Sequence, residues 1–396
     1  MHTAAPGVEG SILIYLDNAA TTRVAPEVFE AMSPFLQDEY GNPSSVYALA
    51  GRSAAAMEDA RRTLADCIGA EPEEIIFTGG GSEADNLAIK GTMRKKDGGH
   101  MITSAIEHHA VLHSCKALQD DGYDLTVVGV DENGMVDPDE VRDAIRDDTR
   151  LITIMHSNNE VGTVQPIAEI AEIARERGVK MHTDAVQSLG KISLDVDALG
   201  VDMMAFSAHK VHGAKGVGAL YLRKGFRPVP LIDGGGQERR LRAGTENVPG
   251  IVGFGKAVEL VEEHGQAAVD RIRELRDRLI DGVMEAIPET ILSGHPEKRL
   301  PNIASFLFRY IEGEGILLSL DMKDIAGSSG SACTSGSLDP SHVLLAMSYP
   351  HEIAHGSLRL SLSRYTTEEE IDTVLDVLPP IIQRLRDMSP LYQKKS

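Results

Sequence analysis

The stretch Val201–Leu222, VDMMAFSAHKVHGAKGVGALYL, places two short apolar runs on either side of a polar, glycine-rich turn. The runs Val201–Ser207 and Val217–Leu222 have the length and composition of buried strands. Five similar runs precede them in the chain. We predict further strands at Glu74–Thr78, His100–Ser104, Leu125–Val130, Arg150–His156 and Lys180–Thr183.

Amphipathic stretches of helical length lie between several of these strands, at Ser82–Arg94, Ala110–Gln119 and Ile167–Arg177. Alternating strands and helices are typical of a mostly parallel sheet covered by helices on both faces. We therefore predict an α/β fold whose large domain is a mostly parallel seven-stranded sheet sandwiched by helices. Ligands of such sheets bind beyond the carboxyl ends of the strands, so polar residues there are candidate functional residues.

The pattern changes at about residue 262. A charged helical stretch, Ala267–Ala286, is followed by strand-like runs at Ala304–Phe308 and Ser357–Leu362 and by a last helix from Thr367 to about Met388. This order predicts a smaller α+β domain. We assign residues 17–261 to the large domain and residues 1–16 and 262–396 to the small one.

Composition excludes several classes of function. The chain of 396 residues has no apolar run of the ~18 residues that a membrane span requires. A net charge of −21 argues against direct DNA binding and against binding to anionic membranes. Three scattered cysteines are too few for a disulfide framework or a zinc cluster, so we expect a reducing compartment, the cytoplasm.

Lys210 closes the strand Val201–Ser207 and is followed by three glycines within eight residues. A lysine withdrawn from water loses its proton more readily, which suits it to form a Schiff base with an aldehyde. Asp184 follows another strand, where an acid can either cap a helix or face a ligand. The turn Gly79–Ser82 between a strand and a helix either serves geometry alone or binds a phosphate. Together these three features supply what a pyridoxal cofactor requires.

Ser328–Ser337, SSGSACTSGS, contains only small and hydroxylic residues around Cys333. Such a stretch cannot pack a core and predicts a mobile loop, about 327–337, with a thiol at its centre. It is either a linker with an incidental cysteine or a loop that carries a nucleophile. Cys67 and Cys115 fall within helical stretches and are expected in the core or on a helix face.

Two histidine groups imitate metal sites. His351-Glu352-Ile353-Ala354-His355 fits the zinc-protease pattern, but Pro350 and Gly356 confine it to little more than one helical turn. His109 and His113 are spaced for one helix face beside His108, yet no carboxylate or cysteine is placed at a ligand spacing with them. We assign no metal to either group.

The chain resembles the cysteine desulfurases, in the class-V aminotransferase group of fold-type I pyridoxal-phosphate enzymes. The resemblance runs from YLDNAATT at residues 15–22 to SLRLS at residues 357–361, nearly the whole chain. Its most specific segments are GNPSS (41–45), EH (107–108), NNEVG (158–162), DAVQS (184–188), HK (209–210) and SACTS (331–335). The last segment resembles the long-loop subgroup, which serves iron–sulfur cluster assembly and tRNA thiolation.

For the cofactor, pyridoxal 5'-phosphate, the resemblance implies that Lys210 holds it covalently and moves protons on the substrate carbons. Asp184 would pair with the ring nitrogen, Gln187 with the ring hydroxyl, and His108 would stack on the ring and assist acid–base steps. The implied phosphate ligands are Gly81, Ser82, Ser207, His209 and, from the other subunit of a homodimer, Thr245. Gly81 and Ser82 replace the Ala and Thr of many relatives but keep the backbone donors and the hydroxyl.

For the substrate, the resemblance implies that Asn159 and Arg359 bind the carboxylate of L-cysteine. Cys333 would take the sulfur as a persulfide, release alanine and pass the sulfur to an iron–sulfur scaffold protein or another acceptor. A selenocysteine lyase or an aminotransferase would share Lys210 and Asp184, although an aminotransferase has no use for Cys333. A non-catalytic sulfur carrier would have no reason to keep the full set.

Overall fold

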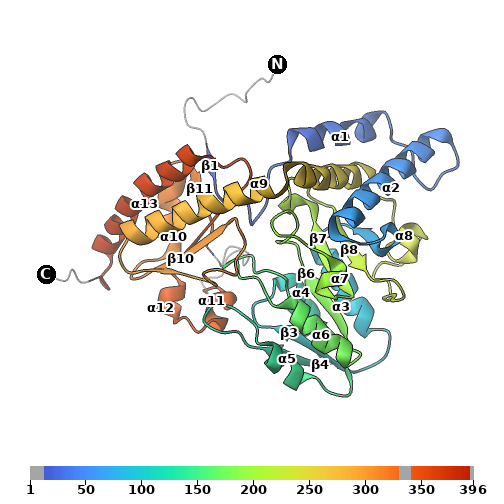
Figure 1. The fold of residues 1–396 in the computed structure, drawn as a ribbon, viewed down its shortest axis with the longest axis horizontal. Coiled ribbons are helices and arrows are strands. Elements are labelled where there is room, and N and C mark those ends of the chain that lie inside the picture. The colour runs from blue at the N-terminus through green and yellow to red at the C-terminus, as the bar shows by residue number, and fades with distance from the viewer. Residues whose placement is uncertain (1–12, 330–339, 393–396) are drawn as a thin grey trace.

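The computed structural model describes residues 13–329 and 340–392. Two lobes lie side by side, and helix α9 (Val248–Ala286) runs across both of them (Figure 1). The predicted loop 327–337 lies largely outside the described residues, and Cys333 lies wholly outside them.

The larger lobe is built on a seven-stranded sheet with the strand order β2-β8-β7-β6-β5-β3-β4. Only β8 runs antiparallel to its neighbours, so the predicted mostly parallel sheet is confirmed. All seven predicted strands form, with ends shifted by at most about three residues. Their bounds are β2 Ile75–Thr78, β3 His100–Ser104, β4 Asp124–Val128, β5 Thr149–Thr153, β6 Lys180–Asp184, β7 Met203–Ser207 and β8 Gly218–Leu222.

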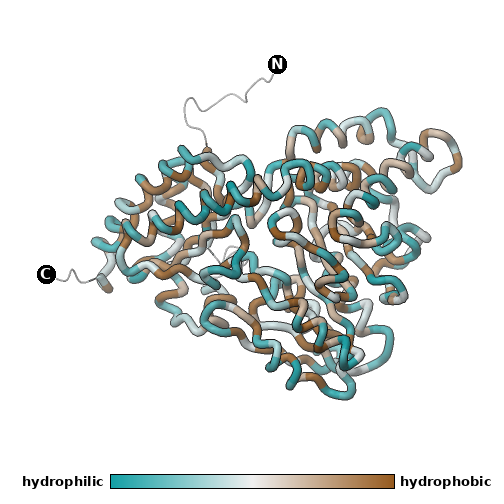
Figure 2. The backbone as a smooth tube through the Cα atoms, in the orientation of Figure 1, coloured by the Kyte–Doolittle hydropathy of each residue, from teal (hydrophilic) through white to brown (hydrophobic). Residues whose placement is uncertain are grey.

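Helices cover both faces of this sheet because its strands are apolar on both sides. In β7, Met203 and Ala205 pack into one cluster with helix α3, whereas Met204 and Phe206 pack into another with helix α2. In the hydropathy colouring, the strands are mainly hydrophobic, and the helices around them carry both hydrophilic and hydrophobic residues (Figure 2). The helices of this lobe are α1 Pro26–Gln37, α2 Ala48–Ile68, α3 Gly81–Met93, α4 His109–Asp120, α5 Pro138–Ala144, α6 Ile167–Glu176, α7 Val196–Leu199 and α8 Gln237–Arg240, with single 3₁₀ turns at Pro72–Glu74 and Ala208–Lys210.

The smaller lobe has its own core around an antiparallel sheet of order β12-β10-β9. β1 (Ile14–Tyr15) crosses from the N-terminal side and pairs in parallel with β11 (Ile325–Ala326). The remaining elements are β9 Thr290–Leu292, β10 Ile303–Phe308, α10 Gly313–Asp321, α11 His342–Ala346, α12 His351–Ala354, β12 Ser357–Ser361 and α13 Glu368–Met388. The domain limits at residues 17 and 262 stay a prediction.

Helix α9 begins 19 residues before the predicted start at Ala267. The preceding segment reads as irregular because it is rich in glycine, but these glycines permit close helix packing. A Cβ at Gly253 would lie 2.6 Å from Met32 Sδ of α1, and one at Gly255 would lie 2.6 Å from Ala60 Cβ of α2. The helix breaks at Gly265, whose φ of 56° is accessible to glycine at little cost.

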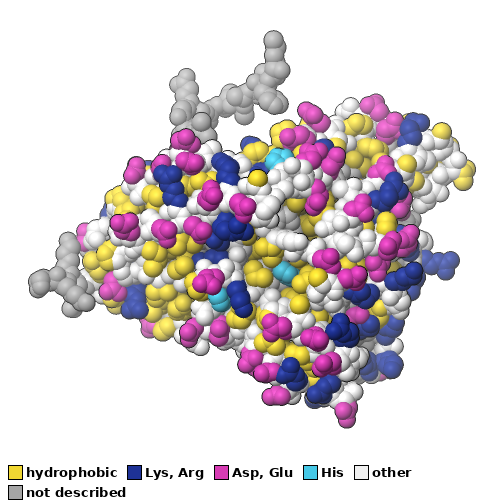
Figure 3. Space-filling model, in the orientation of Figure 1, with side chains coloured by type: hydrophobic (Ala, Val, Ile, Leu, Met, Phe, Trp, Pro, Cys, Tyr) yellow, Lys and Arg dark blue, Asp and Glu magenta, His cyan; other side chains and the backbone are white. Residues whose placement is uncertain are grey.

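The surface carries acidic and basic side chains interspersed on the face shown in Figure 3. Within residues 13–329 and 340–392, no helix is long and apolar enough to cross a membrane. The histidine pattern at residues 351–355 forms one helical turn, α12, just before β12.

Candidate active site

A cavity of about 320 Å³ opens beyond the carboxyl ends of β5, β6 and β7, a volume within the usual range for small-molecule sites. Ten of the twelve predicted site residues line it: Gly81, Ser82, His108, Asn159, Asp184, Gln187, Ser207, His209, Lys210 and Arg359. Thr245 is exposed and is not among the lining residues, and Cys333 lies outside the described part of the chain. The fold therefore brings together residues separated by up to 278 positions in the sequence.

One end of the cavity is the N-terminus of α3, which follows β2 after a tight glycine turn. Gly80 has a φ of 153°, and in the described chain no side chain caps the helix. A Cβ at Gly81 would lie 2.7 Å from Val186 Cγ2, so a larger residue here would require the Val186 side chain to shift. The free N–H groups and the positive end of the helix dipole make this turn suitable for a phosphate.

Asp184 ends β6 at the floor of the cavity. Its Oδ1 accepts a hydrogen bond from the backbone N–H of Val186 at 2.9 Å. Burial raises the pKa of this carboxyl to about 6. A cationic ring nitrogen beside Asp184 would offset the cost of keeping the carboxylate charged in this position.

A second layer of acidic and imidazole groups lies behind Asp184. His182 Nε2 lies 3.6 Å from Asp85 Oδ1, and neither atom has a hydrogen-bond partner among the described residues. Burial, followed by the charge of Asp184, raises the pKa of Asp85 well above its usual range. Burial lowers the pKa of His182 to about 3. These two groups can satisfy each other only if they share one proton.

Glu107 belongs to the same layer and precedes His108 in the chain. Its Oε1 accepts hydrogen bonds from Ser104 Oγ at 2.5 Å and from the Met155 N–H at 2.9 Å. Burial raises the pKa of this fully buried carboxyl to about 8, so it is protonated at neutral pH. No local sequence motif assigns a role to Glu107, Asp85 or His182. Their spacing was a usable signal, because Asp85 follows Ser82 by three residues and His182 lies on the same strand face as Asp184.

Lys210 reaches across the cavity from the turn after β7. Its Nζ donates hydrogen bonds to the backbone carbonyls of Ala19 and Ala20, each at 2.6 Å. Gln187 Nε2 also donates to Ala19 O, at 2.9 Å, while Gln187 Oε1 is buried without a partner in the described chain. An acceptor without a partner that lines the cavity fits a hydroxyl donor on a bound ring.

His108 stands at the N-cap of α4, where its Nδ1 accepts a hydrogen bond from the Ala110 N–H at 3.1 Å. Burial, reinforced by Lys210, lowers the pKa of His108 to about 4. The ring is therefore neutral, and its proton is on Nε2. His109 follows His108 in the chain. Its ring centroid lies 4.9 Å from that of His113 and 4.8 Å from that of His342. In the described ranges no group of three or more side chains could hold a metal ion.

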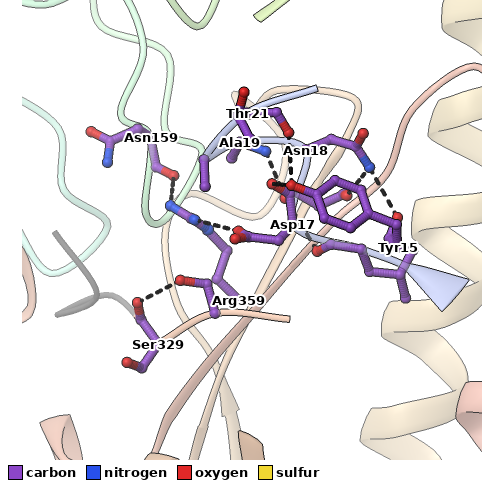
Figure 4. Close-up of polar contacts among 12 residues, drawn as sticks. Tyr15, Asp17, Asn18, Ala19, Thr21, Asn159, Ser329 and Arg359 are labelled. Atoms are coloured by element: carbon purple, nitrogen blue, oxygen red, sulfur yellow. Dashed lines mark hydrogen bonds and ion pairs between the residues drawn. The ribbon is translucent and has the colours of Figure 1, made fainter. Parts of the chain in front are cut away.

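Arg359 projects from β12 and is almost fully buried. Its Nη1 donates to the backbone carbonyl of Asn159 and its Nη2 to the carboxylate of Asp17, both at 2.8 Å (Figure 4). Its Nε is buried without a partner among the described residues. A carboxylate that enters the cavity can take that remaining donor.

Two of the three cysteines are unsuited to nucleophilic chemistry. Cys115 is buried in α4, and Cys67 is half-buried in α2. Burial raises the pKa of each thiol to about 12, so the reactive thiolate form is rare at neutral pH.

The residues at the cavity fit pyridoxal phosphate by the chemistry of their donors. A lysine, a buried carboxylate, an acceptor without a partner at Gln187 Oε1 and the N-terminus of α3, which no described side chain caps, all face one space. This set matches a group with an aldehyde, a basic ring nitrogen, a hydroxyl and a phosphate.

Comparisons with known proteins agree with this geometry. The profile of the family "Aminotransferase class-V" matches residues 14–374. The "Cysteine desulfurase IscS" of Methanosarcina thermophila is 54% identical over 384 residues, which are 96% of this chain and 95% of that protein.

Solved structures show the same likeness. A NifS-like protein superposes with a TM-score of 0.89 at 39% identity, over 94% of this chain and all of that one. SspA, solved in complex with cysteine, superposes with a TM-score of 0.80 at 39% identity, over 89% of this chain and all of that one. The chain therefore belongs to the class-V aminotransferases, a family of pyridoxal-phosphate enzymes, and within it to the cysteine desulfurases.

Proposed function

We propose that this enzyme transfers the sulfur of L-cysteine to Cys333. In the net reaction the carbon–sulfur bond of cysteine breaks and a sulfur–sulfur bond forms on Cys333. Of the two thiol protons, one ends on the carbon that lost its sulfur and the other stays on the new persulfide. The products are one alanine and one Cys333 persulfide. L-Cysteine is bound by the similar protein SspA, which supports it as the substrate here.

The proposed cofactor is pyridoxal 5'-phosphate, held covalently by Lys210 and through its phosphate by Gly81, Ser82, Ser207 and His209. When bound, it supplies an electron sink that makes bonds at the substrate carbons labile. Asp184 would hold the proton of the ring nitrogen, and Gln187 would accept from the ring hydroxyl.

The chain's own residues carry the proton transfers and the binding. Lys210 would move protons on and off the substrate carbons, because its side chain lines the cavity in which the substrate would bind. His108, neutral at physiological pH, would stack on the ring and offer the proton on its Nε2. Arg359 would bind the substrate carboxylate with Asn159.

One observation carries the proposal: the chain just before Cys333 is fixed beside the substrate arginine. Ser328 exchanges two backbone hydrogen bonds with Arg359, at 3.1 and 2.6 Å. Cys333 is five residues further along the sequence, and five residues of fully extended chain span at most ~18 Å. The thiol can therefore reach the cavity that Arg359 lines.

Incubation with L-cysteine followed by mass spectrometry tests this function. We expect equal amounts of alanine and transferred sulfur, with one added sulfur on the peptide that contains Cys333. Sulfur on Cys67 or Cys115 instead, or alanine formed without cysteine consumption, would contradict the proposed reaction.

Thr245 supports a shared site in a homodimer. It is exposed and separate from the cavity of its own chain, which agrees with a phosphate contact made across a subunit interface. Light scattering should give about twice the chain mass of 42.7 kDa. A fully active monomer would rule out this part of the proposal.

Delivery of the sulfur to an iron–sulfur scaffold or a tRNA-thiolation acceptor, in the cytoplasm, completes the proposal. The relatives named IscS support such an acceptor. The free thiol that Cys333 needs before each transfer is maintained in the reducing surroundings that so few cysteines suggest. A selenocysteine lyase remains the alternative within the same fold, and parallel assays with L-selenocysteine distinguish the two.

A further inference from the structure

The turn Asp17–Thr22 joins β1 to the larger lobe and lies against the active-site cavity. Two hydrogen bonds to Ser361 of β12 fix it: the Asn18 side chain donates to Ser361 O at 2.8 Å, and the Ala19 N–H donates to Ser361 Oγ at 2.8 Å. The Tyr15 hydroxyl closes the turn by donating to Thr21 O at 2.9 Å (Figure 4). This part of the chain is therefore rigid enough to position other groups.

The turn contacts the site at three points. The carbonyls of Ala19 and Ala20 accept from Lys210, and Ala19 O also accepts from Gln187. The carboxylate of Asp17 accepts from Arg359 Nη2 at 2.8 Å. Asp17 is thus the only acidic side chain that the described structure pairs with Arg359.

This ion pair is more confined than an ordinary surface pair. The Arg359 side chain is 4% exposed and that of Asp17 is 21% exposed. An isolated buried guanidinium is costly, and a charged partner with good geometry offsets that cost. Because Asn159 O holds Nη1 and Asp17 holds Nη2, the guanidinium plane is fixed by two contacts before any substrate enters.

We propose that Asp17 is a positioning residue for substrate recognition, holding the Arg359 guanidinium so that its remaining donors meet the carboxylate of the substrate. The inference rests on the proposed function, because it takes L-cysteine as the ligand whose carboxylate binds Arg359. Without Asp17, the long arginine side chain regains rotational freedom and must be ordered again each time a substrate binds.

The test compares two ligands that differ only in the carboxylate. L-Cysteine has the group that Arg359 recognises, and cysteamine has the same amine and thiol without it. Both are titrated into the cofactor-loaded Cys333→Ala enzyme, which binds without turnover, and the change in cofactor absorbance gives each dissociation constant. The same titrations are repeated with Asp17→Ala and Asp17→Asn added.

We expect Asp17→Ala to weaken L-cysteine about tenfold, the cost of ordering one long side chain, and to leave cysteamine within about twofold. Asp17→Asn keeps an oxygen that accepts from Nη2, so it should restore most of the L-cysteine affinity. In enzyme with Cys333 intact, the KM for L-cysteine should rise by a similar factor while kcat changes little.

Equal weakening of both ligands, or unchanged binding of L-cysteine, would overturn the role of Asp17. General damage to the site gives the first of these results, and an idle ion pair gives the second. If the parent Cys333→Ala enzyme responds to cysteamine but not to L-cysteine, the assignment of the substrate fails first, and the inference fails with it.

Discussion

The floor and the wall of the cavity are built in different ways. The floor comes from the seven-stranded sheet and holds Asp184, with His182 and Asp85 behind it, all buried with pKa values shifted by desolvation. The wall comes from the junction of the lobes, where the Arg359 guanidinium and the Asp17 carboxylate lie 2.8 Å apart. The floor contains groups without hydrogen-bond partners, whereas in the wall all but one of the described guanidinium nitrogens are paired.

This difference matches two kinds of ligand. In the floor, burial disfavours the charged forms of the titratable groups. Such a site is suited to a group that stays bound and supplies the missing countercharge and hydrogen bonds. A wall with a prepared arginine is suited to a ligand that arrives and leaves, because its donors are already ordered. Substitutions in the two regions should therefore separate cofactor retention from turnover.

The largest effect is expected from Lys210→Ala at the floor. Removing the amine leaves no covalent attachment, so the purified protein should lose its visible cofactor absorbance and all detectable desulfurase activity. Absorption spectra and alanine release measure the two losses. Lys323→Ala, a change of an exposed lysine on the other lobe, is the control. A Lys210→Ala enzyme that still turns over L-cysteine at the wild-type rate would show that the floor is misassigned.

Cys333→Ala should separate the two regions most sharply. The floor is untouched, so the variant should keep its cofactor absorbance and change it on addition of L-cysteine. Sulfur transfer and alanine release by turnover should both be absent, because the acceptor thiol is gone. Cys67→Ala, which removes a thiol with a pKa of about 12, should remain active. Wild-type turnover by Cys333→Ala would overturn the proposed mechanism.

Most of the fold and much of the floor could be predicted from the sequence. The strands are short, apolar and separated by clear breaks. Asp184 ends β6, and Lys210 ends the short turn that follows β7. Their meeting at one sheet edge is a consequence of parallel topology.

The positioning layer could not be predicted in the same way. Asp17 pairs with Arg359 across 342 positions, and no local pattern encodes a contact at that distance. The N-terminal half of α9 was missed because glycine within a helix usually lowers helical propensity, whereas Gly253 and Gly255 are needed for contact with α1 and α2.

The smallest effect is expected from Glu107→Gln, which tests whether the floor carries the electrostatic cost assigned to it. Native Glu107 keeps its proton up to a pKa of about 8, whereas in the unfolded chain it loses it near the ordinary value of 4.5. Between these values the native state binds more protons, so raising the pH destabilises the wild type relative to the variant. Glutamine keeps the acceptor oxygen for Ser104 and Met155 and cannot ionise.

The stabilisation of Glu107→Gln over wild type should therefore grow from pH 5 to pH 8 and level off above it. For a chain of this size we expect a gain of about 1–3 °C in the unfolding midpoint between pH 6 and pH 8. Thermal scans at a fixed rate measure it, and Glu169→Gln on the exposed face of α6 corrects for the general effect of losing one charge. A difference that shrinks as the pH rises would mean that Glu107 is ionised in the native floor, and the contrast with the wall would then lose its electrostatic basis.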